Sequence, residues 1–260
     1  MKSKIKAIFF DVDGTLLSHQ LNDVPKSTRK ALSDLQEKGV KTVVATGRHM
    51  SEYSLLPVSD IPFDAYLTLN GNLILDADRR VYAGTPIDGG EMEVLAQIFK
   101  AKRIPFALIG EEGRYINYIN DTVVETQNKT KGKVPELGTY KGEKVYQILA
   151  FVPEHEKKLL DDLLDECQVT SWNETGIDII PKDGGKSVGI QKYLEEQGFD
   201  REEVMAFGDG ENDIDMLRYA GIGVAMGNAT DNVKEAADYV TDTVDNDGIY
   251  KALKHFGLID

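Results

Sequence analysis

The chain has 260 residues, of which 41% are hydrophobic and 28% charged, a composition typical of a globular protein with one large or two modest domains. Its 44 acidic side chains outnumber its 30 Lys and Arg, and the net charge of −14 opposes binding to nucleic acid or an anionic membrane surface. One cysteine excludes a disulfide framework and a Cys-rich zinc cluster. No apolar run approaches the roughly 18 residues of a membrane span. We therefore expect a cytoplasmic protein without nucleic-acid or membrane partners.

The first part of the chain has the pattern of alternating buried strands and helices. Short apolar runs indicate strands at Ala7–Phe10 and Val40–Ala45. Between them, apolar residues recur at helical spacing and a glycine marks a stop, which predicts a helix from Pro25 to Lys38. Two strands joined by a helix are the unit from which parallel sheets are built.

The middle of the chain has a different secondary-structure pattern, with more predicted strands and fewer predicted helices. Strands are predicted at Pro105–Ile109, Tyr115–Ile119, Val145–Val152, Val169–Trp172 and Ile177–Ile180, and helices at Glu91–Ala101 and His155–Cys167. We interpret residues 83–184 as an α+β domain inserted into the outer fold.

Alternation of strands and helices returns in the last part of the chain. Strands are predicted at Val204–Phe207, Ile222–Met226 and Tyr239–Thr241, and helices at Val188–Gln197, Asp213–Ala220, Asn232–Ala237 and Ile249–Phe256. The fold class is therefore α/β, with residues 1–82 and 185–260 forming a Rossmann-like core around a mainly parallel sheet.

Two aspartates directly follow the first predicted strand, in the stretch Asp11-Val12-Asp13-Gly14-Thr15. Residues two apart in an extended chain project to the same side, so Asp11 and Asp13 can face one site. Ligands bind at the carboxyl ends of strands in open α/β sheets. An isolated Asp-x-Asp-Gly is nevertheless more often an ordinary turn.

Two further stretches carry groups that suit a phosphate. Thr46-Gly47-Arg48 closes the second strand, where a hydroxyl and a glycine amide are neutral donors to phosphate oxygens. Gly184-Gly185-Lys186-Ser187 precedes a helix, but the glycine that a phosphate-binding P-loop requires five residues before Gly185 is Ile180. The P-loop reading therefore fails, and each stretch alone is also compatible with a plain turn.

The fourth stretch, Gly208-Asp209-Gly210-Glu211-Asn212-Asp213, lies between a predicted strand and a helix. Asp209 and Asp213 offer hard oxygen ligands of the kind that Mg²⁺ prefers. Helix capping by aspartate or asparagine is the structural alternative at such a junction.

Taken together, the four stretches resemble the haloacid dehalogenase superfamily of phosphohydrolases. The first matches the Asp-x-Asp-Gly-Thr signature of that family in full, and the others follow in the family's order. Between Thr15 and Thr46 lie 30 residues, too few for a cap domain. Between Arg48 and Lys186 lie 137 residues, which leave room for one. This arrangement, with Gly-Asp-Gly-x-Asn-Asp in the fourth stretch, resembles the Cof-type branch along the whole chain.

The resemblance implies an enzyme that forms an aspartyl-phosphate. Asp11 would attack phosphorus, and Asp13 would protonate the leaving oxygen and then deprotonate the attacking water. Mg²⁺ would be held by the Asp11 carboxylate, the Asp13 backbone carbonyl and Asp209, with Asp213 in or just outside its coordination shell.

The same resemblance implies a phosphate-binding set. It consists of Thr46, Gly47, Lys186 and Asn212, which would hold the oxygens of the transferring phosphoryl group. Arg48 is close enough in sequence to reach the site but is not placed in this set.

The expected activity is hydrolysis of a small phosphorylated metabolite, such as a sugar phosphate, FMN or pyridoxal phosphate, with specificity set by residues 83–184. A phosphomutase that moves phosphate within one sugar is an alternative. A non-enzymatic phospho-acceptor module is a weaker one, because such modules have about half this length and need no acid–base group at Asp13.

Overall fold

The computed structural model describes residues 5–129 and 132–260 of the chain. They form two compact units, Met1–Ala83 with Gly185–Asp260 and, between these two segments, Gly84–Gly184. Each unit has its own sheet and its own apolar core. The units are called the core unit and the inserted unit below.

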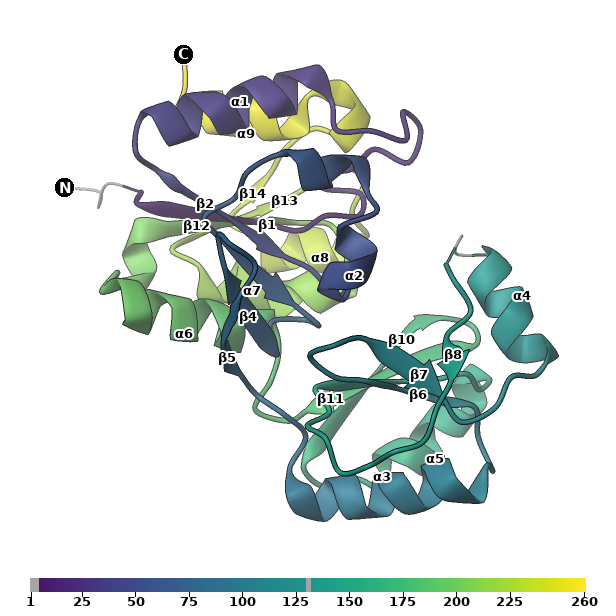
Figure 1. Cartoon of the computed structure of the whole chain (residues 1–260). Coiled ribbons are helices and arrows are strands. Elements are labelled where there is room, and N and C mark those ends of the chain that lie inside the picture. Colours follow the sequence, from purple (N-terminus) through teal and green to yellow (C-terminus); the bar gives the residue numbers. More distant parts are fainter. Residues whose placement is uncertain (1–4, 130–131) are drawn as a thin grey trace. The chain divides into compact units, whose positions relative to one another are not determined.

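The core unit contains an eight-stranded sheet in the order β14-β13-β12-β1-β2-β3-β4-β5 (Figure 1). Neighbouring strands from β14 to β3 are parallel, and β4 is antiparallel to β3. The strands are β1 Ala7–Phe10, β2 Lys41–Ala45, β3 Ala65–Thr68, β4 Leu73–Asp76, β5 Val81–Gly84, β12 Val204–Gly208, β13 Ile222–Ala225 and β14 Tyr239–Val240. The predicted α/β class with a mainly parallel sheet is confirmed.

Strand β1 lies in the middle of this sheet and is fully buried because both faces are covered. Phe9 contacts Tyr193 of helix α6 (Lys186–Gln197) edge-on, with ring centroids 5.5 Å apart. Phe10, one residue on, points to the opposite face and stacks on Phe207 at 5.2 Å. A strand buried on both sides reads as a continuous apolar run, which is why β1 is visible in the sequence.

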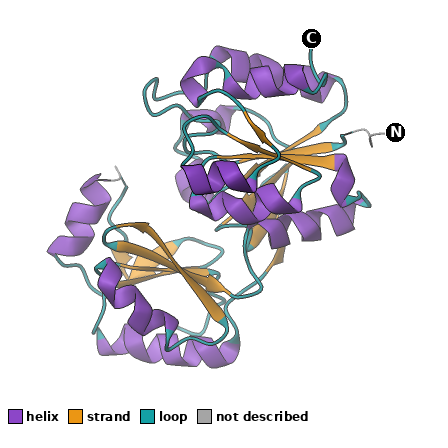
Figure 2. Ribbon diagram, turned by 180° about the vertical axis from the view of Figure 1, so that it is seen from behind, coloured by secondary structure: helices purple, strands orange, loops and turns teal. Residues whose placement is uncertain are grey.

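Helices cover both faces of the core sheet (Figures 1 and 2). α1 and α9 pack together on one face, and α6, α7 and α8 on the other. Their bounds are α1 Lys26–Glu37, α6 Lys186–Gln197, α7 Ile214–Tyr219, α8 Asp231–Ala236 and α9 Gly248–His255, with a short α2 at Met50–Tyr53. Because β1, β2, β3 and β12 are parallel, the loops after all four lie at one edge of the sheet.

The inserted unit contains a six-stranded sheet in the order β10-β11-β9-β6-β7-β8. Its strands are β6 Phe106–Ile109, β7 Arg114–Ile116, β8 Glu136–Leu137, β9 Gln147–Ala150, β10 Cys167–Asn173 and β11 Gly176–Pro181, and its helices α3 Gly89–Ala101, α4 Asp121–Lys129 and α5 Lys157–Asp161. Its apolar core joins α3 and α5 to the sheet through residues such as Phe99, Leu160 and Ile148.

The predicted helix His155–Cys167 is wrong in its second half. α5 ends at Asp161, and Cys167 opens strand β10, which pairs antiparallel with β11. Leu160 and Leu164 are both buried at helical spacing, but Cys167 and Val169 enter the same core two residues apart, which is the period of a strand. The structure also contains β3, β4, β5, α2 and α4, which the sequence patterns did not predict.

Among the described residues, none of the helices has the length and apolar character needed to cross a membrane.

Helix α7 and strand β13 approach each other closely because Gly223 has no side chain. A Cβ at Gly223 would lie 2.1 Å from the carbonyl oxygen of Leu217 in α7. This contact sets the distance between β13 and the helix that follows the Asp209–Asp213 loop.

We expect Gly223→Ala to lower the free energy of unfolding by about 3 kcal/mol, since the rigid backbone of α7 must move to admit the methyl group. The matched control is Gly39→Ala, where φ is +75° but nothing lies within 4 Å of the added Cβ. That change should cost about 1 kcal/mol, from backbone strain alone. Urea unfolding of both variants measures the difference, and an equal or larger loss for Gly39→Ala would contradict the argument.

Candidate active site

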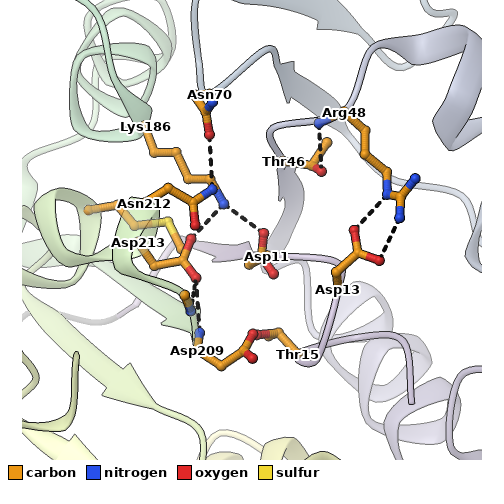
Figure 3. Close-up of polar contacts among 12 residues, drawn as sticks. Asp11, Asp13, Thr15, Thr46, Arg48, Asn70, Lys186, Asp209, Asn212 and Asp213 are labelled. Atoms are coloured by element: carbon orange, nitrogen blue, oxygen red, sulfur yellow. Dashed lines mark hydrogen bonds and ion pairs between the residues drawn. The ribbon is translucent and has the colours of Figure 1, made fainter. Parts of the chain in front are cut away.

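The four sequence stretches lie at one edge of the core sheet, and two are held there by hydrogen bonds that extend the strand ladders. The amide of Asp11 donates to the carbonyl of Phe207 at 2.9 Å, one residue beyond the β1–β12 pairing. The amide of Thr46 donates to the carbonyl of Leu67 at 2.8 Å, beyond the β2–β3 pairing. Figure 3 shows the side chains that these loops place together.

Lys186 lies at the centre of the site, between two aspartates. Its Nζ donates to Asp11 Oδ1 at 2.6 Å and to Asp213 Oδ1 at 2.5 Å (Figure 3). The side chains of Lys186 and Asp213 are fully buried, and that of Asp11 is 9% exposed. An ammonium group in such surroundings requires anionic partners, so the three side chains stabilise one another.

Asp213 also holds the backbone of its own loop. Its Oδ2 accepts hydrogen bonds from the amides of Asp209 and Gly210, both at 2.9 Å. With Oδ1 bonded to Lys186, both carboxylate oxygens have protein partners. Asp213 therefore links the start of α6 to the loop after β12.

Asp209 is oriented by neutral donors from two other loops. Thr15 Oγ1 donates to Asp209 Oδ1 at 2.8 Å, and Asn228 Nδ2 donates to Asp209 Oδ2 at 3.1 Å. The same Asn228 amide donates to the carbonyl of Gly14 at 2.9 Å. These bonds hold the Asp209 carboxylate beside the first motif.

Asp13 is held by Arg48 rather than by the lysine. Arg48 Nε donates to Asp13 Oδ2 at 2.6 Å and Arg48 Nη2 to Asp13 Oδ1 at 2.8 Å, a bidentate pair (Figure 3). Both side chains are about one-third exposed, at 31% and 32%. The pair therefore lies at the solvent side of the site, unlike the buried Asp11–Lys186–Asp213 group.

The remaining predicted phosphate-binding residues lie around these charges. Thr46 is buried, and its Oγ1 accepts from the amide of Arg48 at 3.2 Å. Asn212 reaches across to the loop after β3, where its Nδ2 donates to Asn70 Oδ1 at 2.9 Å. Gly47 lies beside the same Asn70 side chain, since a Cβ at Gly47 would be 3.1 Å from Asn70 Oδ1.

Burial and crowding disturb the ionisation of the acids. Burial raises the pKa of Asp11 well above its ordinary value, and repulsion from Asp213 adds to the rise while Lys186 opposes it. Burial, with repulsion from Asp213, raises the pKa of Asp209 to about 6. Burial alone would lower the pKa of Lys186, but the two adjacent carboxylates outweigh it and raise that pKa. The site thus holds more negative charge than its lysine neutralises.

This donor set fits a divalent metal ion. One carboxylate oxygen from each of Asp11, Asp209 and Asp213 lies within 4.8 Å of the others. Hard oxygens suit Mg²⁺, and an added cation would relieve the repulsion that raises the pKa values of Asp11 and Asp209.

Several contributors to this site were missed or left aside in the sequence. Arg48 was left out of the predicted set, and its pairing with Asp13 depends on the alignment of two loops after neighbouring strands. Asn70 and Asn228 each lie in a loop without a catalytic or metal-binding motif, so the sequence does not predict their contribution. The Asn70-Gly71 dipeptide after an apolar run is a turn signal that could have directed attention to that loop.

Comparisons with known proteins agree with the fold. The profile of the haloacid dehalogenase-like hydrolases matches residues 8–253. The chain is 32% identical over 260 residues to the 5-amino-6-(5-phospho-D-ribitylamino)uracil phosphatase YcsE of Bacillus subtilis (strain 168), covering 98% of this chain and 96% of the relative.

Two solved structures superpose along the whole length of the chain. One is a phosphatase of the haloalkanoate enzyme superfamily from Bacteroides thetaiotaomicron, with a TM-score of 0.91 and 34% identity over 98% of this chain and 96% of that one. The other is a subclass IIB sugar phosphatase of that superfamily, with a TM-score of 0.86 and 35% identity over 98% and 100%.

The fold, the site and these comparisons define a hydrolase that acts on phosphate esters. The chain belongs to the haloacid dehalogenase-like hydrolase family, as a phosphatase of its Cof-type branch.

The raised pKa of Asp209 leads to a pH-dependent stability prediction for the metal-free protein. A folded-state pKa of about 6 lies above the ordinary value of 3.8, so ionising Asp209 costs stability as the pH rises from about 4 through about 6. We expect Asp209→Asn to remove this cost. In the presence of a chelator, the melting temperature of the variant relative to wild type should therefore increase over that pH range and then level off.

Differential scanning fluorimetry at closely spaced pH values measures this difference. Asp78→Asn is the matched control, since the Asp78 side chain is 69% exposed and its melting-temperature difference should not follow this course. A difference for Asp209→Asn that is constant with pH would contradict the prediction.

Proposed function

We propose that this phosphatase is a Mg²⁺-dependent phosphomonoesterase of small metabolites that works through a phosphorylated Asp11. The observation that carries the proposal is the position of Asp11, directly after the central strand, with its carboxylate bonded to the buried Lys186 and next to Asp209 and Asp213. A carboxylate held in this way is a positioned nucleophile rather than a surface charge.

In the first chemical step, an oxygen of Asp11 attacks phosphorus in line with the ester oxygen, which leaves as an alcohol. Lys186 holds the Asp11 carboxylate through Oδ1 at 2.6 Å, and this bond limits rotation of the nucleophile. In the second step, water attacks the phosphorus of the aspartyl-phosphate, the bond between phosphorus and the Asp11 oxygen breaks, and inorganic phosphate and the Asp11 carboxylate are released. Orienting the nucleophile and stabilising the charge of the transferring group are the two ways in which a protein accelerates phosphoryl transfer.

Asp13 supplies the proton to the leaving alcohol and later accepts one from the attacking water. Each of its oxygens accepts one hydrogen bond from Arg48, which leaves a lone pair on each oxygen to carry the proton that Asp13 donates to the ester oxygen. The partial exposure of the pair leaves Asp13 accessible to the substrate and to water. Arg48 thus holds Asp13 ready beside the nucleophile.

Asp11, the backbone carbonyl of Asp13 and Asp209 are the residues proposed to hold Mg²⁺. When bound, the ion would neutralise the phosphate charge and allow an anionic nucleophile to approach it. Asp213 was expected in or just outside the coordination shell. Since its two oxygens already accept bonds from Lys186 and two backbone amides, we assign it to the outer position, where it orients Lys186 and the Asp209 loop.

The phosphoryl oxygens would be held by neutral and cationic donors. These are Thr46, Gly47, Lys186 and Asn212, which come from the loop after β2, the start of α6 and the short helical turn Glu211–Asp213. Donors fixed by their own loops cost little reorganisation when negative charge develops on the phosphoryl group.

The substrate class is a small phosphorylated metabolite, and sugar phosphates and phosphorylated pyrimidine intermediates are the first candidates because relatives of this chain act on them. The residues proposed for catalysis, metal binding and phosphate binding all lie outside the inserted unit. We therefore propose that this unit, expected at residues 83–184, is a cap that selects the substrate.

The proposal is tested by measuring phosphate release from a panel of metabolites with Mg²⁺ present. The panel contains sugar phosphates, FMN, pyridoxal phosphate and the phosphoribitylamino uracil. We expect Asp11→Asn to lower kcat/KM on the best substrate by several orders of magnitude, because no neighbouring group can replace the nucleophile.

Asp78→Asn, an exposed aspartate of the core unit, should retain wild-type activity. If Asp11→Asn keeps a tenth of the wild-type rate, the nucleophile is a different group. If wild type produces an isomeric sugar phosphate instead of free phosphate, the enzyme is a mutase.

Metal removal gives an independent test. We expect a chelator to abolish phosphate release and Mg²⁺ to restore it. Ca²⁺ should bind without supporting comparable turnover. It takes more oxygen ligands at longer distances, so both oxygens of the Asp11 carboxylate would bind the ion and neither could attack phosphorus. Asp209→Ala should weaken Mg²⁺ binding measured by calorimetry. Equal rates with chelator and with Mg²⁺, or unchanged Mg²⁺ affinity in Asp209→Ala, would count against the proposed metal site.

A further inference from the structure

The turn that follows β3, Leu69-Asn70-Gly71-Asn72, has an unusual backbone next to the active site. Leu69, Asn70 and Gly71 have φ values of 52°, 55° and 81°, three successive residues in the left-handed region. Leu69 is fully buried and Asn70 is 4% exposed. Branched and bulky side chains disfavour this conformation, so surrounding contacts must hold the turn in place.

One set of contacts joins this turn to the Thr46-Gly47-Arg48 loop. The amide of Asn70 donates to the carbonyl of Thr46 at 2.9 Å, and the amide of Leu69 donates to the carbonyl of Arg48 at 3.2 Å. The two loops follow neighbouring parallel strands, β2 and β3, and are therefore held in fixed register.

A second contact joins the turn to Asn212. Asn70 Oδ1 accepts a hydrogen bond from Asn212 Nδ2 at 2.9 Å (Figure 3). Asn70 is buried, whereas Asn212 belongs to the exposed start of the short helical turn Glu211–Asp213. The buried side-chain carbonyl of Asn70 thus fixes the rotamer of the exposed Asn212 side chain. The second N–H of the Asn212 amide can then donate to another acceptor.

A third contact joins the turn to the start of α6, where Lys186 lies. A Cβ at Gly71 would lie 2.6 Å from the carbonyl oxygen of Gly185 and 3.0 Å from Cα of Lys186. One turn further along α6, a Cβ at Gly189 would lie 2.8 Å from Cα of Gly71. Backbone therefore packs directly on backbone at this point.

We infer that Asn70 is a positioning residue for phosphate binding, and that it acts by fixing the amide of Asn212. The inference rests on the proposed function, in which Asn212, Lys186 and the Thr46 loop bind the phosphoryl group. The left-handed turn touches all three, and Asn70 is the residue whose side chain extends from it to Asn212. In this inference, the left-handed backbone is what directs the Asn70 side chain toward Asn212.

The test uses the full-length protein and p-nitrophenyl phosphate with Mg²⁺. Asn70→Gly keeps the left-handed backbone available but removes the side chain, so the loop contacts of the turn are preserved. We expect KM, and the inhibition constant of inorganic phosphate, to rise about fivefold, the worth of one hydrogen bond, while kcat changes less than about twofold.

A double-mutant cycle shows whether Asn70 acts through Asn212. Asn212→Ala should raise KM at least as much as Asn70→Gly does. In the Asn212→Ala background, adding Asn70→Gly should have less than about a twofold further effect, because the amide to be positioned is gone. A full fivefold effect in that background would overturn the inference.

Asn22→Gly is the matched control, since Asn22 is an exposed asparagine with φ of 53°. It should leave KM and the phosphate inhibition constant unchanged. A purely structural role for Asn70 would lower the melting temperature of Asn70→Gly without changing KM, which would also overturn the inference.

Wild type and Asp11→Asn are assayed in parallel to distinguish a failure of the proposed function from a failure of the role assigned to Asn70. If wild-type hydrolysis does not depend on Asp11, the proposed function itself fails. If hydrolysis depends on Asp11 but Asn70→Gly binds phosphate as tightly as wild type, only the role of Asn70 is wrong.

Discussion

The candidate active site depends on one buried cation, the ammonium group of Lys186, which lies between Asp11 and Asp213. Removing Lys186 would leave two buried carboxylates without their cation, a loss that typically costs 3–5 kcal/mol, on the order of a third to a half of a domain's stability. The three residues come from the loop after β1, the start of α6 and the loop after β12. A single set of hydrogen bonds therefore fixes the relative positions of three segments that are far apart in the chain.

Charge also explains how the site is divided. Asp11, Asp209 and Asp213 are crowded on the interior side, where burial and repulsion raise the pKa values of Asp11 and Asp209. Asp13 lies apart and is paired with Arg48 at the solvent side. Two aspartates that are neighbours in the first motif thus have different partners and different surroundings, as expected for side chains that perform different chemical tasks.

Much of the core unit was predictable from the sequence, because strands buried on both faces, such as β1 and β12, form continuous apolar runs that few other structures produce. The inserted unit was less predictable. The residues around Cys167 have a helical pattern before them and a strand pattern after them, and only pairing with β11 determines where the change occurs. Strands β3 and β4 were not predicted, and with them the turn that carries Asn70 was missed.

The predicted site residues share loops at one edge of the sheet, which follows from the parallel order of the strands. The partners of these residues could not be predicted. Whether Arg48 reaches Asp13, or Asn212 reaches Asn70, depends on side-chain directions across neighbouring loops, and sequence spacing does not contain this information.

The two connections between the units differ in a way that matters for exchanging the inserted unit between proteins. The chain leaves the core unit through β5, an edge strand with exposed residues, and returns at Gly185, directly before Lys186. A junction between two proteins at the first connection would adjoin only the exposed edge strand β5, where changes of length and sequence are tolerated. A splice at the second meets backbone that packs against Gly71 and precedes the central cation. Chimeras of this fold should therefore tolerate varied junctions at one side of the insert and a single register at the other.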